Sequence, residues 1–186
     1  MKNNLRLGMI LLLIAALAGF SLGAVHSITA EPIAKAKASA KQNAMIEILP
    51  KVDEFKDHKV ELNDKVLEVN AGYKEGKIVG YAIKVSPKGY SGAVEIMVGI
   101  YTDGTVGGIK ILSHSETPGL GANAPKPKFS GQFENKSTSE ELIVVKGSAS
   151  TDNQVEAITG ATITSKAVVN GVNDAVEFYN SNLKGE

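Results

Sequence analysis

Residues 77–113 read KIVGYAIKVSPKGYSGAVEIMVGIYTDGTVGGIKILS, and this stretch decides the fold. It contains three runs rich in Val and Ile, which favour strands. The runs are residues 77–85, 93–101 and 105–113. A Pro- and Gly-rich loop separates the first two, and Asp103-Gly104 between the last two is a strong hairpin signal. The stretch therefore predicts an antiparallel sheet built from consecutive strands.

The flanking sequence adds two more strands and a helix. Two further strands are predicted at residues 66–71 and 141–146, and the second is expected to be buried. An ordered loop is predicted at residues 115–128, which contain three Pro and two Gly. Residues 164–183 have helical spacing of apolar side chains. The face expected to cover the sheet consists of Val168, Gly171, Val172, Ala175, Val176, Tyr179 and Leu183. The predicted fold class is α+β, a small domain with a mainly antiparallel sheet packed by helices.

The N-terminal part has the composition of a membrane anchor. Residues 7–25 (LGMILLLIAALAGFSLGAV) carry no charge, and as a helix they would span about 28 Å, close to the thickness of a hydrocarbon core. Lys2 and Arg6 precede this run, which predicts a cytoplasmic N-terminus and an exported remainder. The alternative is a cleaved signal peptide, with small residues near 23–24 or 29–30 as cleavage sites, and it also exports the domain.

A second helix is expected directly after the anchor. Residues 31–49 are rich in Ala and Lys, with Pro32 in the first turn and Pro50 after the end. The expected organisation has three parts. These are residues 1–30 as cytoplasmic N-terminus and transmembrane anchor, 31–56 as connecting helix, and 57–186 as globular domain.

Composition excludes several functions. The chain of 186 residues has no Cys, so it has no Cys-ligated iron–sulfur cluster, no CxxCH haem attachment and no thiol nucleophile. A formal net charge of zero gives no reason to expect nucleic acid as a partner. His114 and Glu116 lack a third ligand at sensible spacing, so no metal site is expected.

Hydroxyl-bearing and small residues crowd the expected start of the last helix. They are Thr159, Gly160, Ala161, Thr162, Thr164 and Ser165. One interpretation is capping, because Ser and Thr satisfy the unpaired N–H groups of a helix start. The other is a phosphate site, because those N–H groups and the helix dipole attract anions. From composition alone, capping is favoured.

Two loops complete the candidate residues. Residues 114–121 read HSETPGLG, which fits a stiff surface loop or the wall of a cofactor pocket that offers backbone N–H groups and Leu120. Residues 88–92 read KGYSG and are either an ordinary loop or a segment that puts Tyr90 beside a ring.

Two of these segments resemble a known family. Residues 159–162 are similar to the S/T-G-A-T flavinylation motif of FMN-binding subunits, and residues 114–121 resemble their H-x-E-T-P-G-L-G signature. The family comprises the G subunit of the Rnf electron-transport complex and the related C subunit of the sodium-translocating NADH:quinone reductase. The layout of one membrane helix before an exported domain also agrees, and the short length favours the Rnf G subunit.

The resemblance implies FMN bound through its phosphate to the hydroxyl of Thr162, attached by a separate exported flavin transferase. The implied cofactor-binding residues are Thr162 with Thr159, Gly160, Ala161, Thr164, Ser165, Glu116, Thr117, Leu120, Tyr90 and Ser91. Thr164 and Ser165 would donate to the phosphate, Thr117 and Leu120 would contact the ring, and Glu116 would orient the loop. Glu156 stands where the family often has Asp, and Phe129 where relatives often carry Trp.

The function implied is that of an electron-carrier subunit. It would relay electrons between partner subunits of a membrane ferredoxin:NAD oxidoreductase that pumps Na⁺ or H⁺, with the FMN domain on the extracytoplasmic side. The chain has no G-x-G-x-x-G motif and no Cys, so neither the NAD site nor the ferredoxin site is expected here. The alternatives are a free-standing membrane-anchored flavoprotein and a tethered binding module without a cofactor.

Overall fold

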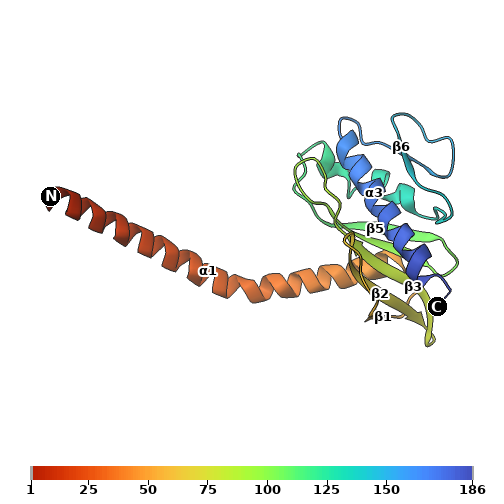
Figure 1. Cartoon of the computed structure of the whole chain (residues 1–186), viewed down its shortest axis with the longest axis horizontal. Helices are drawn as coiled ribbons and strands as arrows, with labels where there is room; N and C mark the ends of the chain where they lie inside the picture. Colours follow the sequence, from red (N-terminus) through yellow and green to blue (C-terminus); the bar gives the residue numbers. More distant parts are fainter. Residues whose placement is uncertain (1, 186) are drawn as a thin grey trace. The chain divides into compact units, whose positions relative to one another are not determined.

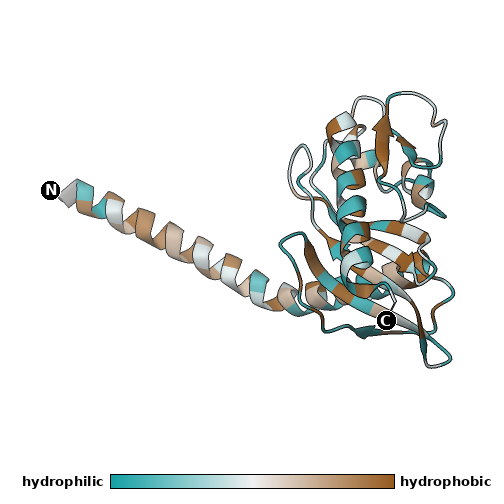
Figure 2. Cartoon of the chain, turned by 45° about the vertical axis from the view of Figure 1, so that its right-hand side comes forward, coloured by the Kyte–Doolittle hydropathy of each residue, from teal (hydrophilic) through white to brown (hydrophobic). Residues whose placement is uncertain are grey.

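The computed structural model describes residues 2–185, which form two compact units divided between Lys41 and Gln42. The first unit is helical. Helix α1 (Lys2–Ile48) is exposed along its apolar part and is long and apolar enough, from Asn4 onward, to cross a membrane. Figure 2 shows the apolar residues that run along it. This agrees with the predicted anchor.

Helix α1 is continuous where a break was expected. The sequence suggested one helix before residue 30 and another that begins near Pro32, but Pro32 lies inside α1. A proline removes one intrahelical hydrogen bond and bends a helix, and an otherwise Ala- and Leu-rich helix tolerates this loss. The helix ends at Ile48, shortly before Pro50, because a residue preceding proline disfavours helical geometry. The three-part organisation remains a prediction.

The second unit is built on a five-stranded antiparallel sheet (Figure 1). Its strands, in spatial as in chain order, are β1 (Glu54–Asp57), β2 (Val66–Lys74), β3 (Lys77–Val85), β4 (Glu95–Tyr101) and β5 (Val106–Ser113). Gly104, in the turn after β4, has φ +82°, which confirms the predicted Asp103-Gly104 hairpin. Strand β1 was not predicted, because its four residues are mostly exposed and charged and show no apolar alternation.

Alternating side chains of the sheet enter two separate cores. Tyr81, Ile83, Ile96, Val98 and Ile100 point to the larger core on one face. The intervening Ala82 and Met97 face the other side, where they meet Met45, Ile48 and Leu49 from the end of α1 and the residue after it. The end of α1 can pack closely against this side because β4 has Gly99 there. A Cβ at this position would lie only 2.9 Å from Ile48 Cγ1. Both faces of the sheet are therefore covered.

Helix α3 (Thr162–Phe178) covers the larger core (Figure 1), and a π-helical turn, η3 (Tyr179–Leu183), continues it. Every residue of the predicted apolar face is buried. The helix begins two residues earlier than predicted, at Thr162. These elements confirm the α+β class, a long apolar N-terminal helix followed by a small antiparallel-sheet domain.

The segment between β5 and α3 forms short elements. They are η1 (Gly121–Asn123), α2 (Pro127–Ser130), η2 (Gly131–Phe133), β6 (Ile143–Val145) and β7 (Gln154–Glu156). Strand β6 was expected to be buried, but Ile143 is 45% exposed, and β6 pairs in parallel with β7 outside the main sheet. Leu142, just before β6, supplies the buried side chain instead. Phe129 packs edge-on against Phe133, a local packing role.

Candidate functional site

The start of α3 has unpaired backbone donors. Its N-cap is Ala161, which makes no side-chain capping bond, and the preceding Gly160 has φ +76°. Within residues 2–185, no backbone hydrogen bond uses the N–H groups of Thr162, Ile163 or Thr164. Three donors at the positive end of a 17-residue helix therefore point outward, an arrangement that favours an anion.

The nearby hydroxyls do not cap these donors. Thr164 Oγ1 donates to Glu116 Oε2 at 2.5 Å. Ser165 Oγ donates to the Ala161 carbonyl and accepts from the Ile158 N–H, both at 2.9 Å. The capping interpretation of the sequence is therefore wrong for this cluster. The expectation that the Thr164 and Ser165 hydroxyls donate to a phosphate remains a prediction, and in this structure both hydroxyls donate to protein acceptors. In the described chain the Thr162 hydroxyl has no hydrogen-bond partner.

A single buried carboxylate joins the three candidate segments. Glu116 is 5% exposed, and its Oε1 accepts from the backbone N–H groups of Tyr90 at 2.9 Å and Ser91 at 3.0 Å. Its Oε2 accepts from Thr164. The loop 88–92, the loop 114–121 and the start of α3 are thus held by one side chain. The carboxylate can accept all three bonds only because it has two oxygens with several lone pairs.

The protein environment keeps Glu116 ionised. Burial raises its pKa, but the hydrogen bonds from Thr164, Ser91 and Tyr90 lower it more. The electrostatic influence of the nearby His114 acts in the same direction, and the net result is a pKa below the ordinary glutamate value. His114 Nδ1 also accepts a hydrogen bond from the Glu116 N–H at 3.2 Å.

This pKa predicts how stability depends on pH. Because the folded-state pKa of Glu116 is lowered, ionised Glu116 stabilises the fold above the unfolded-state pKa of about 4.3, and this stabilisation is lost as the pH falls through the folded value. We expect the free energy of unfolding of wild type to exceed that of Glu116→Gln at neutral pH, and the gap to close under acid. Urea titrations across the pH range measure this, and a gap that does not change with pH would contradict it.

The three segments enclose a pocket of about 530 Å³. Its lining consists of Tyr90, Glu116, Thr117, Leu120, Gly121, Gly160, Ala161, Thr162, Ile163 and Thr164. Three large apolar side chains at this pocket stay exposed, Tyr90 at 67%, Ile163 at 55% and Leu120 at 41%. Exposed apolar side chains beside unpaired N–H groups fit a ligand with a flat apolar part and an anionic part.

Most of the sequence-predicted residues meet at this pocket. Ser91 contributes its backbone N–H to Glu116, Ser165 is buried behind the helix start, and Thr159 lines a neighbouring hollow with Lys126 and Lys128. Two lining residues were not predicted as site residues. Gly121 is the last residue of the 114–121 motif, so the motif already pointed to it. Ile163 lies in the first turn of α3, and an isoleucine that is exposed there could have indicated a ligand contact.

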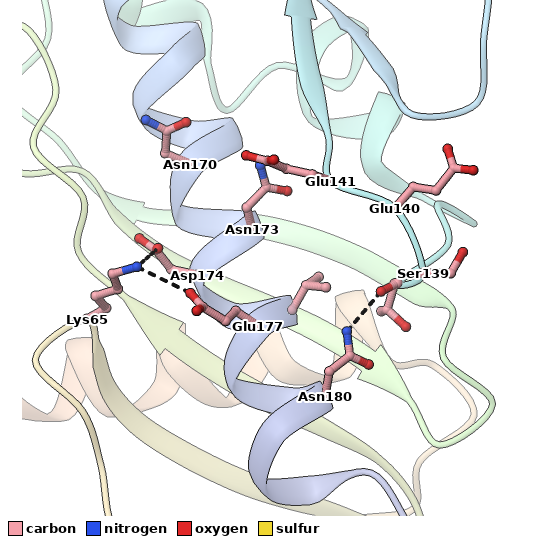
Figure 3. Close-up of a pocket in the computed structure, with 11 residues that line it drawn as sticks. Lys65, Ser139, Glu140, Glu141, Asn170, Asn173, Asp174, Glu177 and Asn180 are labelled. Atoms are coloured by element: carbon pink, nitrogen blue, oxygen red, sulfur yellow. Dashed lines mark hydrogen bonds and ion pairs between the residues drawn. The ribbon is translucent and has the colours of Figure 1, made fainter.

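Another hollow lies along the later turns of α3, and unlike the pocket at the start of α3 it is lined mainly by charged and amide side chains (Figure 3). There Lys65 Nζ pairs with Asp174 at 2.8 Å and Glu177 at 3.3 Å, and Asn180 donates to the Thr138 carbonyl. Asp174 is twelve residues after Thr162, which is about 18 Å along a helix. Asp174 and Glu177 already bind Lys65, and the hollow contains no residue of a predicted site.

The fold and the site together define a class of protein, a small antiparallel-sheet domain whose pocket, at the start of its last helix, suits a ligand with an anionic part and a flat apolar part. The comparison with protein families agrees, because the model of the FMN-binding domain matches residues 89–177. This range contains all residues of the pocket.

Close relatives then fix the family. The chain is 40% identical to the G subunit of the Na⁺-translocating ferredoxin:NAD⁺ oxidoreductase complex of Acetobacterium woodii, over 96% of this chain and 92% of that protein. It is also 40% identical to the proton-translocating counterpart of Clostridium ljungdahlii, over 87% and 83%. The G subunit of the ion-translocating oxidoreductase complex of Methanosarcina acetivorans is 33% identical over 92% of both. The chain therefore belongs to the family of G subunits of these complexes, and with helix α1 this supports a membrane location.

A solved structure shows the same fold. The C subunit of the Na⁺-translocating NADH-quinone reductase of Parabacteroides distasonis aligns with a TM-score of 0.59 at 22% identity, over 78% of this chain and 93% of that one. This likeness concerns the fold and supports the shared architecture.

Proposed function

We propose that this chain is an electron-carrier subunit whose FMN is esterified through its phosphate to Thr162. The observation that carries the proposal is the pocket at the uncapped start of α3. There the unpartnered Thr162 hydroxyl, among the residues that the structure describes, lies beside three open N–H groups and an exposed apolar wall. The bound flavin would supply the redox chemistry, accepting and donating electrons.

The chain's own residues bind and orient this cofactor. The N–H groups of Thr162, Ile163 and Thr164 stabilise the negative charge that a phosphate diester keeps. Leu120, Tyr90 and Ile163 supply apolar contact for the ring, and Thr117 lines the same wall. A covalent tether suits an exported domain, because a dissociating cofactor would be lost there.

Attachment needs a separate flavin transferase. A threonine hydroxyl is a poor nucleophile without an adjacent base, and within residues 2–185 the Thr162 hydroxyl has no hydrogen-bonded base. The nearby carboxylate of Glu116 is already used by Thr164 and two backbone N–H groups. Glu156, at the motif position where the family often has Asp, is partly exposed and accepts from the Ala149 N–H at 3.0 Å.

The partners of the chain are the other membrane subunits of an ion-translocating ferredoxin:NAD oxidoreductase. Lys2 and Arg6 before the apolar run orient the N-terminus to the cytoplasm and the FMN domain to the other side. By their names, one of two relatives is a subunit of a complex that translocates Na⁺ and the other of a complex that translocates protons.

Affinity purification of the tagged chain from native membranes tests this function. We expect polytopic membrane subunits to co-purify, a flavin-fluorescent band in the denaturing gel at the size of this chain, and bleaching of its flavin absorbance on addition of reduced ferredoxin. Flavin without partner subunits would instead support a free-standing flavoprotein. A chain without flavin from a host with active transferase would support a binding module without a cofactor.

A further inference from the structure

The pocket at the start of α3 has one charged side chain in its wall. Of the ten residues that line it, all of them described, only Glu116 carries a charge at neutral pH. Glu116 as a residue is 5% exposed, so water screens its charge less than that of an exposed carboxylate. Such a charge acts on anything bound beside it more strongly than a surface carboxylate does.

We propose that Glu116 is a tuning residue, whose negative charge lowers the reduction potential of the flavin held in this pocket. The proposal rests on the proposed function, because it presumes the flavin. Full reduction of a bound flavin would take up two electrons. With two protons the reduced ring would be neutral, but at alkaline pH it would take up only one proton and would carry one negative charge. A fixed negative charge beside the ring opposes that product and leaves the neutral oxidised ring unaffected.

The geometry keeps this charge in place. Glu116 cannot turn toward solvent without breaking its bonds from Tyr90, Ser91 and Thr164. Space is also closed around it, because a Cβ on Gly89 would lie 2.5 Å from Oε1 and one on Gly121 would lie 2.6 Å from Oε2. The Glu116 side chain therefore has two roles, because it carries the negative charge and also accepts the hydrogen bonds that hold the pocket together.

Glu116→Gln separates these two roles. Gln Oε1 can accept from the Tyr90 and Ser91 N–H groups, and its amide can donate to Thr164 Oγ1, because a hydroxyl also accepts. The hydrogen bonds that hold the pocket are kept and only the charge is removed. The matched control is Glu177→Gln, a carboxylate whose side chain is 68% exposed, 15 residues further along α3 than Thr162.

The test is a redox titration of the full chain in detergent at alkaline pH, with dithionite as electron donor, which is oxidised to sulfite. We expect Glu116→Gln to shift the reduction equilibrium toward the reduced flavin by roughly tenfold, about 30 mV for a two-electron couple. The Glu177→Gln protein should titrate like wild type. The fluorescence of the denatured proteins reports flavin loading independently.

Each outcome decides one question. A loaded and folded Glu116→Gln protein with the wild-type potential overturns the tuning role and leaves the proposed function standing. A Glu116→Gln protein whose thermal transition in circular dichroism is lost also overturns it, because the charge would then be a structural requirement. An equal shift in Glu177→Gln would show a nonspecific charge effect and overturn it too. Wild type without covalent flavin contradicts the proposed function instead.

Discussion

Thr162→Ala is expected to abolish covalent flavin. In the proposed site only the Thr162 hydroxyl combines three properties, a place in the pocket, proximity to the open N–H groups of α3, and no hydrogen-bond partner among residues 2–185. Wild type co-expressed with an active flavin transferase should gain the mass of one FMN less one water. The Thr162→Ala protein should gain nothing, and intact-mass spectrometry measures both.

Two control variants make the Thr162 result specific. Thr162→Ser keeps a hydroxyl and should accept flavin, although the missing methyl group lowers the yield. Ser181→Ala removes an exposed hydroxyl outside the motif and the pocket, and should be loaded like wild type. Full loading of Thr162→Ala would assign the ester to another residue.

Gly121→Ala is expected to lower the stability of the fold strongly. A Cβ at residue 121 would lie 2.5 Å from Thr164 Oγ1, 2.6 Å from Glu116 Oε2 and 2.9 Å from Glu116 Cβ. The new methyl group must therefore separate Thr164 from Glu116, which breaks a buried hydrogen bond as well as overpacking the site. We expect a loss of about 3 kcal/mol and a transition temperature lower by roughly 10 °C.

The matched control for this change is Gly131→Ala. Gly131 has no neighbouring heavy atom within 4 Å of a built Cβ, and its φ of −68° suits any residue. Thermal unfolding of the full chain in detergent, followed by circular dichroism, should leave Gly131→Ala within about 1 kcal/mol of wild type. Equal stability of the two variants would show that the pocket wall can yield, and that Glu116 is not held as tightly as the contacts indicate.

The elements predicted well are those whose pattern is local. Strand β3 has the predicted bounds, and the apolar face of α3 is buried at every predicted position, because alternation and helical spacing follow from how side chains meet one core. Strands β1 and β7 have four and three residues, too few for a pattern, and their pairing is fixed by neighbours distant in sequence.

In the candidate site, too, the local motifs could be predicted and the contacts between distant residues could not. The motifs identified which segments carry it, but the sequence could not show that Glu116 reaches Thr164, 48 residues away, or that Ser165 turns to Ile158. For this reason the capping interpretation looked plausible from composition. Hydrogen-bond partners are set by tertiary contacts, and the same Thr and Ser side chains can cap, bind or pack.

Peptide-level tandem mass spectrometry of the wild-type chain, prepared with an active flavin transferase, tests the central claim most directly. The account predicts one flavin-fluorescent peptide that contains residues 159–165, with the FMN phosphate on Thr162 and with Thr159, Thr164 and Ser165 unmodified. An FMN phosphate on any of those three residues, or no modified peptide despite active transferase, would contradict it.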